Sequence, residues 1–456
     1  MATSFAHAAV APVETPAVDK TGVLASTHVT DLAQLYREAR LEDPRVLAAY
    51  ARAEAAEARE REAFGALLPQ LSANGAYNRT RRDDGTYAEL YNNDRLSLGL
   101  TQHLYNKAAW ENYQEFKNRA RQQGFEAESA QAEATVDLAE RYFAALAADD
   151  ELELVIAEQR ATRENLDRVE ALYERQMAMI TDVLDLRARV DALAAMEVEA
   201  RNQVRLSREA LSEIVGRPVT EKLSRIREDI ALQAPQESIE DWVRRALASN
   251  PALKAHASAV EAANAALREG KGGHYPSVSF SINAQRSDVG YDNTLAPLTD
   301  TYVASIGVQV PIYSGGSTSA RVRALRADEM AAEQELEAIR RQVVNQTTSA
   351  YLTAHAGVEQ IRASYNALES AEQSSIAAQK GFQYGVVNSV DVLTSVQNEY
   401  QARRELLQAQ YDFITNLLVL NRWSGGLSAG TVEKVNVWLS RNETPRALEE
   451  ADTDSR

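Results

Sequence analysis

The sequence predicts a mainly α-helical protein with a smaller β component, built from two similar halves that each combine a strand hairpin with a long helical hairpin. Three observations support this mixed α/β fold class: a repeat at a nearly constant offset, two strand-like alternations in each half, and long stretches without proline. Only 45% of the 456 residues are hydrophobic, and alanine-rich charged segments dominate. This composition is typical of long helices rather than of several compact cores.

The repeat consists of matching residues that lie about 207 to 209 positions apart over most of the chain. The clearest matches are Asp43-Pro44 with Asn250-Pro251, Pro69 with Pro276, Arg79 with Arg286, Gly99 with Gly307, Tyr105 with Tyr313, Asp182-Val183-Leu184 with Asp391-Val392-Leu393, and Gly216 with Gly425. This offset indicates gene duplication, and the unit is too long for a short solenoid repeat. We therefore expect repeats at residues 30–217 and 237–426, an inter-repeat segment at 218–236, a disordered leader at 1–29, and a tail at 427–456 that ends in disorder.

The charge and the absence of cysteine exclude several classes of function. The formal net charge is −17 and no basic run is long enough to follow a phosphate backbone, so nucleic acid is not an expected partner. The chain has no cysteine, which excludes disulfides, thiolate metal sites, a cysteine nucleophile and a lipidated N-terminal cysteine. The histidines are scattered, and no pair has metal-ligand spacing on a helix.

Motifs for catalysis are also missing. Residues 270–273 and 314–317 are glycine-rich, but neither segment has the spacing of a phosphate loop. Each adjoins an expected strand boundary, where a turn explains the glycines. Carboxylates are abundant on the expected helix faces, where solvation is the ordinary explanation. We expect no enzymatic activity, no cofactor and no structural metal.

The hydropathy pattern excludes an inner-membrane helical protein. No apolar run approaches the roughly 20 residues that cross a bilayer as a helix, and the most apolar segment, Phe413–Leu420, is interrupted by Thr415 and Asn416. Near the N-terminus, Ala6-His7-Ala8 has the small-x-small form of a signal-cleavage site. Residues 1–8 are either the remnant of a secretory signal or an ordinary disordered tail, and the sequence favours neither.

The first half begins with an expected helix at residues 31–68, broken at Pro44. Apolar and polar residues then alternate from Leu71 to Tyr77 and again from Leu96 to Leu100, which is the period of a strand. A polar turn is expected between them at residues 81–94. The first strand hairpin is thus placed at about residues 70–105.

The second half repeats this pattern. Strand-like alternation runs from Val278 to Ala284 and from Ala304 to Ile312, so the second strand hairpin is placed at about residues 276–313. The loop between these strands is expected to contain Gly290, Asp292, Asn293 and Pro297. Each strand is about ten residues long, which is the length that a tilted strand needs to cross a bilayer.

A helix of unusual length follows each strand hairpin, at about residues 107–174 and 316–382. Each would extend roughly 100 Å at 1.5 Å per residue. One heptad seam, formed by Val136, Ala139, Phe143 and Leu146, indicates helices packed side by side. Second helices return at about 181–215 and 390–423, which gives helical hairpins at 107–216 and 316–424.

The four expected strands are too few to close a membrane barrel. In lipid every edge N–H and C=O must be paired, and the smallest such barrels have about eight strands. Three copies would supply twelve strands, and their helices would continue the wall as an α-helical barrel. Two alternatives are a periplasmic coiled-coil adaptor and a scaffold without a pore, but both leave the two matched strand hairpins unexplained.

Several short segments resemble those of the TolC family of outer-membrane efflux and secretion channels. They run from about residue 30 to 426, in the family's order and in both halves: Leu68-Pro69-Gln70-Leu71, Leu100-Thr101-Gln102 to Tyr105, His274-Tyr275-Pro276, Val310-Pro311-Ile312-Tyr313-Ser314-Gly315-Gly316 and Val390-Asp391-Val392-Leu393. The resemblance implies a homotrimer with one twelve-stranded barrel in the outer-membrane lipid of a Gram-negative bacterium and an α-helical tunnel in the periplasm. An equatorial belt would come from residues 218–236 and from the segment after residue 427.

The resemblance also implies a function and partners. The expected function is passive conduction of drugs or secreted proteins to the exterior. An inner-membrane ABC, RND or MFS transporter would supply the energy, and a periplasmic adaptor (membrane fusion) protein would connect it to the channel. The absence of a cysteine for lipid anchoring favours the secretion-type branch of the family over the lipid-anchored drug-efflux branch.

The two turns between the long helices correspond to the family's periplasmic entrance, at residues 175–180 and 385–389. The resemblance makes them the adaptor-docking turns, with these residues as candidates: Gln176, Met177, Met179, Gly385, Val386 and Ser389. Asp182 and Asp391 follow the turns at equivalent positions. Three copies of Asp391 would form a cation-selecting ring that a multivalent cation could plug. The alternative role for either residue is a carboxylate at a helix N-terminus, which contributes about 0.3 to 1 kcal/mol.

The sequence departs from the family's entrance at several positions. A second aspartate of the family's ring matches Thr394 here, whereas the first half has the pair Asp182 and Asp185. The tyrosine and arginine that lock the family's closed entrance match Phe382 and Val387. We therefore expect a gate held by packing rather than by ion pairs. Gln176 replaces the glycine of the first turn, so we expect adaptor docking to differ between the halves.

Overall fold

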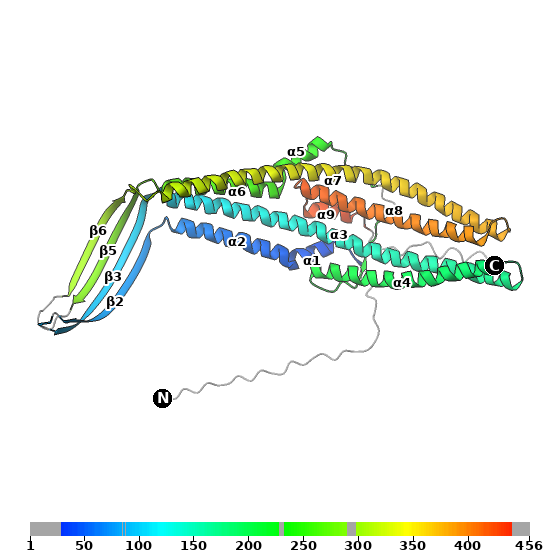
Figure 1. Ribbon diagram of the computed structural model, residues 1–456, viewed down its shortest axis with the longest axis horizontal. Coiled ribbons are helices and arrows are strands. Elements are labelled where there is room, and N and C mark those ends of the chain that lie inside the picture. Colours follow the sequence, from blue (N-terminus) through cyan, green and yellow to red (C-terminus); the bar gives the residue numbers. More distant parts are fainter. Residues whose placement is uncertain (1–28, 84, 87, 228–231, 290–297, 440–456) are drawn as a thin grey trace, which may run out of the picture.

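The computed structural model describes residues 29–83, 85–86, 88–227, 232–289 and 298–439. The molecule is elongated, with a β-sheet at one end and two helical hairpins that reach the other end (Figure 1). The possible signal remnant at residues 1–8, the glycine-bearing loop at 290–297 and the polar stretch at 442–456 lie outside the described residues.

The sheet contains four antiparallel strands in the order β2-β3-β5-β6. The two predicted hairpins are β2 (Gln70–Asp83) with β3 (Ala88–Asn106) and β5 (Ser277–Val289) with β6 (Thr299–Gln309). They form a single sheet because β3 pairs with β5 along most of its length. The two halves of the chain are therefore joined strand to strand.

Several expected strand boundaries are wrong: β2 ends later than predicted, β3 and β6 begin earlier, and β6 also ends earlier. The predicted turn at residues 81–94 is mostly strand, because pairing continues as far as Asp83 with Ala88. The ladder uses backbone groups, so polar side chains do not interrupt it. Conversely, the predicted strand to residue 312 ends at Gln309, whose partner Ser277 is the first residue of β5. Beyond that point Pro311 has no N–H to donate.

The long helices agree with the predicted ranges. α3 (Lys107–Glu174) and α4 (Ile180–Val215) form the first helical hairpin, and α7 (Ser317–Gln383) and α8 (Ser389–Trp423) form the second. α3 begins where Asn106 Oδ1 accepts a hydrogen bond from the N–H of Ala109 at 3.0 Å. The two hairpins lie side by side and end together at the tips opposite the sheet (Figure 1).

Shorter helices precede each strand hairpin. These are α1 (Leu32–Glu42) and α2 (Pro44–Gly65) in the first half and α5 (Ile239–Ser249) and α6 (Pro251–Gly272) in the second. The predicted break at Pro44 is confirmed, and it recurs at Pro251. At both breaks the residue before the proline caps the next helix, since Asp43 accepts from the N–H of Arg45 and Asn250 from that of Leu253. None of the helices in the described part of the chain combines the length and apolar character needed to cross a membrane.

A group of small elements packs against the middle of the long helices, and we call this region the waist. It comprises α1, β1 (Val29–Thr30), β4 (Lys222–Leu223), α9 (Ala429–Asn436) and the adjoining parts of α3, α4 and α8. β1 pairs in parallel with β4, and Ile226 bridges to Leu439. The inter-repeat segment and the chain after residue 427 therefore meet here. The largest hydrophobic cluster also lies at the waist and contains the predicted seam of Val136, Ala139, Phe143 and Leu146.

Candidate functional site

The turns at the two tips have the same backbone geometry. Gln176 (φ 62°) and Gly385 (φ 74°) both adopt the left-handed conformation. In each turn the next N–H reaches back into the preceding helix, from Met177 to the C=O of Leu172 at 2.8 Å and from Val386 to that of Gly381 at 2.9 Å. These are the bonds of a Schellman motif, in which glycine is the usual residue at the left-handed position. Gln176, which stands in the place of that glycine as predicted from the sequence, therefore keeps the turn. Its backbone conformation is strained, because the residue carries a side chain.

The two helices that leave the tips are capped differently. Asp182 and Asp391 both occupy the third helical position, but the preceding caps are Met179 and Asn388. Asn388 Oδ1 accepts a hydrogen bond from the N–H of Asp391 at 2.7 Å. Methionine is a poor cap, and the Asp182 carboxylate instead turns back to accept from the N–H of Met179 at 3.4 Å. Asp391 is exposed, and its carboxylate makes no hydrogen bond or ion pair with any described residue.

One turn further along each helix, the candidates also differ. Asp185 is exposed on α4, and in the described part of the chain its carboxylate has no partner. Thr394, at the matching position of α8, donates its hydroxyl to the C=O of Val390 at 2.9 Å. The Thr394 hydroxyl is therefore bonded within its own helix, and the residue carries no charge. The structure places Asp391 alone in the second half, and Asp182 with Asp185 in the first.

An apolar cluster joins the two hairpins just behind the tips. Its buried members come from α3 and α4, and Phe382 and Leu393 of the second hairpin pack against it: Leu166, Val169, Val183, Leu186 and Val190. Val387 lies against its own hairpin, because a Cβ added at Gly381 would meet Val387 Cγ2 at 2.6 Å. Of the two gate candidates, Phe382 thus bridges the hairpins and Val387 packs locally.

The outermost residues of both turns expose apolar side chains. Met177 is 72% exposed, Met179 67%, and Val386 77%, and the neighbouring Tyr384 is also exposed. Apolar side chains gathered at an exposed tip are typical of a surface that binds another protein. Ser389 differs from the other predicted docking residues, because it is buried as the first residue of α8. It is not available for docking in this arrangement.

The sheet at the opposite end has one apolar and one polar face. The strand register aligns apolar side chains on one face: Leu71, Ala73, Tyr77, Leu96, Leu98, Leu100, Val278, Phe280, Ile282, Ala284, Tyr302, Ala304, Ile306 and Val308. Many of them are exposed. The other face of the same register carries mainly small polar residues: Ser72, Asn74, Asn78, Ser97, Thr101, Ser279, Ser281, Asn283, Gln285, Thr301 and Ser305. A mainly apolar face opposite a mainly polar one is typical of a sheet between lipid and water.

A β-bulge in β3 extends the apolar face toward the helices. The register shifts between His103 and Tyr105, so Leu104 has no partner on β5 and Tyr105 lies opposite Val278. The extra residue reverses the alternation. Tyr105 therefore lies on the apolar face rather than the polar one. Sequence reasoning did not reveal the bulge, since a single inserted residue changes no composition.

Buried charges connect the two hairpins at the waist and on its side toward the tips, and we call them together the waist network. Glu158 of α3 is fully buried and pairs with Arg189 of α4 and with Arg404 of α8, the latter at 3.1 Å. Arg404 also pairs with Glu151 at 2.7 Å. Sequence reasoning missed this network, because nothing in the sequence places residues 158 and 404 side by side.

A second buried group at the waist is Asp150 of α3. It accepts a hydrogen bond from the hydroxyl of Tyr411 on α8, and Arg225 of the inter-repeat segment lies 2.9 Å from it. Burial raises the pKa of Asp150 to about 6, against the opposing effects of the Arg225 charge and the Tyr411 hydrogen bond. This carboxyl therefore titrates near neutral pH while it links both halves to the inter-repeat segment.

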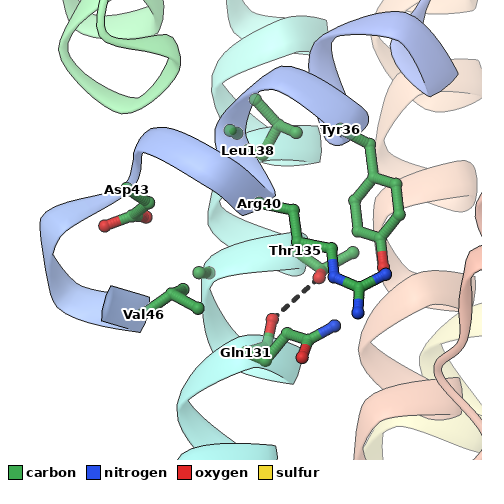
Figure 2. A pocket seen from close by; sticks show the side chains of 9 residues that line it. Tyr36, Arg40, Asp43, Val46, Gln131, Thr135 and Leu138 are labelled. Carbon is green, nitrogen blue, oxygen red and sulfur yellow. Dashed lines mark hydrogen bonds between the residues drawn. The ribbon is translucent and has the colours of Figure 1, made fainter. Parts of the chain in front are cut away.

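A small cavity lies where α1 and α2 bend over α3 (Figure 2). Its volume of about 10 Å³ has room for roughly one water molecule. Tyr36, Arg40 and Gln131 are among the lining residues, and the Thr135 hydroxyl is already bonded to the C=O of Gln131 at 2.8 Å. The cavity is too small for an organic ligand and belongs to the packing of the waist.

Comparison with known proteins agrees with this architecture. The family model described as "Outer membrane efflux protein" matches residues 35–217 and 242–426, which are close to the two predicted repeats. The chain is 30% identical over 414 residues to the outer membrane protein TolC of Vibrio cholerae, covering 90% of this chain and 94% of that protein. It is 29% identical over 427 residues to the alkaline protease secretion protein AprF of Pseudomonas aeruginosa, covering 90% and 88%.

Solved structures show the same fold. One of CusC, whose title concerns transmembrane channel formation, superposes with a TM-score of 0.78 at 15% identity, covering 90% of this chain and 96% of that chain. Similarity at this low identity extends to the arrangement of helices and strands and not to individual side chains. The duplicated arrangement of strand and helical hairpins is thus shared with a known channel fold.

Proposed function

The chain belongs to the outer membrane efflux protein family, and we propose that three copies form a passive conduit across the periplasm and the outer membrane. Each copy would contribute four strands to a twelve-stranded barrel and two helical hairpins to a periplasmic tunnel. Cargo would enter at the tips and leave through the barrel. An inner-membrane ABC, RND or MFS transporter would supply the energy, and a periplasmic adaptor would join it to the tips.

The observation that carries this proposal is the amphipathic sheet, whose two edges are unpaired in the part of the chain that the structure describes. Among the described residues, β2 and β6 each have a strand neighbour on one side. In lipid both open edges must find partners. Pairing β6 of one copy with β2 of the next satisfies them, and three copies close the ring with the apolar face toward lipid.

The height of the apolar face fits a membrane. Tyr77 lies opposite Asp94 at the outer end of this face, and Tyr105 lies eleven residues further along β3 at the inner end. At about 3.4 Å per residue and a tilt near 40°, this distance is roughly 28 Å along the membrane normal. Tyrosines at both ends correspond to the aromatic girdles of outer-membrane barrels.

A contrast between the two longest helices supports the assembly of several copies. α3 buries apolar residues along most of its length, whereas the buried residues of α7 are few and include Thr347, Ser364 and Ser375. Large apolar residues on α7 are instead exposed: Met330, Leu352, Tyr365 and Ile376. Neighbouring copies in a helical barrel would cover them. The expected particle contains three chains of 50.2 kDa, or about 150 kDa of protein.

At the tips, Asp391 is the proposed selectivity residue. Because Asn388 caps α8, the Asp391 carboxylate is free to face a threefold axis as a ring of charge. Asp182 is partly used as a helix cap and would contribute less. The exposed Met177, Met179 and Val386 would receive the adaptor. Phe382 would hold the closed gate by packing against the first hairpin.

Drugs and secreted proteins both suit such a conduit as cargo. The relative from Pseudomonas aeruginosa is named for the secretion of alkaline protease. We therefore propose the secretion-type branch, with a protein as cargo.

Single-channel recording in a planar bilayer tests the conduit and its ring. Cobalt(III) hexaammine, a trivalent cation, is added on the side of the tips. We expect it to block the wild type, and Asp391→Ala to weaken block by about tenfold, which corresponds to roughly 1.4 kcal/mol. Thr394→Ala is the matched control, since Thr394 lies one turn away on α8 and its replacement by alanine leaves the charge unchanged.

Each outcome is informative. A particle of about 150 kDa that conducts and loses block only in Asp391→Ala supports the proposal. A purified trimer that conducts no current overturns the conduit and favours an adaptor or scaffold. Equal block in the wild type and Asp391→Ala retains the conduit but removes Asp391 as its ring.

A further inference from the structure

The polar face of the sheet is almost free of charge. On β3 this face presents Asn93, Arg95, Ser97, Gly99 and Thr101, and the residues opposite them on β2 are Asn78, Ala76, Asn74, Ser72 and Gln70. The matching positions of β5 and β6 are Ser, Asn, Gln, Thr, Val or Gly in the described residues. Arg95 is thus the one charged side chain of this stretch in the part of the chain that the structure describes.

Arg95 is exposed, and none of the acidic residues that the structure describes pairs with it. It lies opposite Ala76 on β2 and opposite Ser287 on β5, so its cross-strand neighbours are small and neutral. No described residue forms an ion pair with it, whereas Arg286 on the other face is paired with Asp300 at 2.8 Å. A charge placed among uncharged neighbours keeps its full effect on the water-filled side.

The strand register also places Arg95 along the length of the sheet. Its neighbour Asp94 lies opposite Tyr77, which marks the outer end of the apolar face. Arg95 is therefore near the outer end of the polar face. Its strand β3 lies at the opposite end of the molecule from the tip where α8 begins (Figure 1), and Asp391 is the third residue of α8. Arg82 is further out on the same face, where Glu89 lies opposite it in the register.

We propose that Arg95 is a second selectivity residue, which forms a cationic ring near the outer opening of the conduit. This inference rests on the proposed trimer, since the threefold assembly brings three copies of Arg95 around one lumen. The ring would repel small cations and attract the carboxylate or phosphate groups of anionic cargo. The acidic ring at Asp391 acts in the opposite sense, so the two ends of the conduit differ in sign.

The test is the reversal potential of the channel in a tenfold KCl gradient at low salt. Low salt matters because the Debye length grows to about 30 Å at 0.01 M and lets the ring act across a wide lumen. We expect Arg95→Gln to raise the ratio of potassium to chloride permeability by about twofold or more, and Arg95→Lys to keep the wild-type value. Arg79→Gln is the matched control, because it removes the same charge from the apolar face of the same sheet.

A cysteine variant separates this effect from a folding defect. The chain contains no cysteine, so Arg95→Cys introduces a single thiol. Currents are recorded from one channel before and after an anionic or a cationic methanethiosulfonate reagent is added. We expect the anionic reagent to raise cation selectivity and the cationic reagent to restore the wild-type value, with no shift in Arg79→Cys.

The results distinguish this inference from the proposed function. Conducting Arg95→Gln and modified Arg95→Cys channels with the wild-type reversal potential overturn the ring but leave the conduit intact. Equal shifts in the Arg95 and Arg79 variants also overturn it, because a charge on the lipid side should not act on ions in the lumen. A wild-type trimer that carries no current overturns the conduit and the ring together.

Discussion

The tips and the waist connect the same two helical hairpins by different interactions. At the tips, Phe382 and Leu393 pack on an apolar cluster of the first hairpin, and the nearby aspartates form no ion pair with any described residue of the other hairpin. At the waist, Glu158 and Asp150 connect α3 to α8 through buried charges. Apolar contacts are non-directional and tolerate sliding, whereas buried ion pairs lose several kcal/mol when their geometry is broken.

This difference indicates which junction can move. The largest hydrophobic cluster lies at the waist, together with the charge network. The cluster behind the tips is small and borders exposed turns. A structure of this kind opens locally where buried contacts are few. We therefore expect the tips to separate while the waist stays fixed.

The largest expected effect is at Glu158. Replacing it with alanine leaves Arg189 without its partner and weakens the hold on Arg404, which keeps Glu151. A broken buried pair usually costs about 3 to 5 kcal/mol. Because both arginines retain some contact with water, we expect the free energy of unfolding to fall by about 2 to 4 kcal/mol. Chemical denaturation of the detergent-solubilised protein measures it.

Glu170→Ala is the matched control for Glu158→Ala. Glu170 lies on the same helix and pairs with Arg187 of α4 at 2.7 Å, but the Arg187 side chain is exposed and that of Glu170 is 37% exposed, against 0% for Glu158. Such a surface pair contributes about 0 to 1 kcal/mol. Equal losses in the two variants would show that the waist network is no stronger than a surface pair, and the comparison with the tips would fail.

The stability of the protein should depend on pH through Asp150 at the waist. The pKa of Asp150 is raised to about 6 by burial, whereas the ordinary value is 3.8. The folded state therefore binds this proton more tightly than the unfolded state. Its contribution to stability is complete below about pH 4 and is lost as the pH rises through about 6, amounting to roughly 3 kcal/mol.

Asp150→Asn should remove this pH dependence. We expect the wild type to lose about 2 to 3 kcal/mol relative to the variant between pH 4 and pH 7.5, measured as denaturation midpoints. Glu153→Gln is the control, since Glu153 shares Arg225 but is 61% exposed. A wild-type profile that parallels that of Asp150→Asn would contradict the raised pKa and leave the waist insensitive to pH.

The sequence predicted the regular elements better than the connections between them. The ranges of α3 and α7 were correct within about one residue, because a capping asparagine or a glycine turn marks each start and a Schellman turn each end. The length of β2 and β3 was underestimated, since polar residues conceal a strand whose pairing uses backbone groups. The type of these elements and the extent of the long helices could thus be predicted from local pattern, but the extent of the strands could not.

The candidate residues at the tips could be named from the sequence, but their contacts could not. The matching positions of Asp182 and Asp391 were visible in the repeat, and the structure confirms that both are third residues of a helix. The waist network joins residues 246 positions apart, and no local pattern contains that information.

The two tip turns have the same backbone geometry, but only the first places a residue with a side chain at the left-handed position. Gln176 occupies a left-handed position that costs a side-chain-bearing residue about 1 kcal/mol or more, and Gly385 occupies the same position without this cost. We expect Gln176→Gly to stabilise the protein by about 1 kcal/mol and Gly385→Gln to destabilise it by a similar amount. Denaturation midpoints provide the measurement. If both variants changed stability in the same direction, the turns would not share one geometry.

The smallest expected effect is that of Asp182→Ala on the gate. The Asp182 carboxylate accepts one long hydrogen bond at 3.4 Å from the N–H of Met179, and across the hairpins it pairs with no described cation. Its loss should cost about 0.5 kcal/mol of helix capping and leave the resting conductance nearly unchanged. Phe382→Ala, which removes packing between the hairpins, should raise resting conductance more. A sharp rise in Asp182→Ala alone would mean that charge holds the tips together, and the contrast between an apolar tip and a charged waist would have to be abandoned.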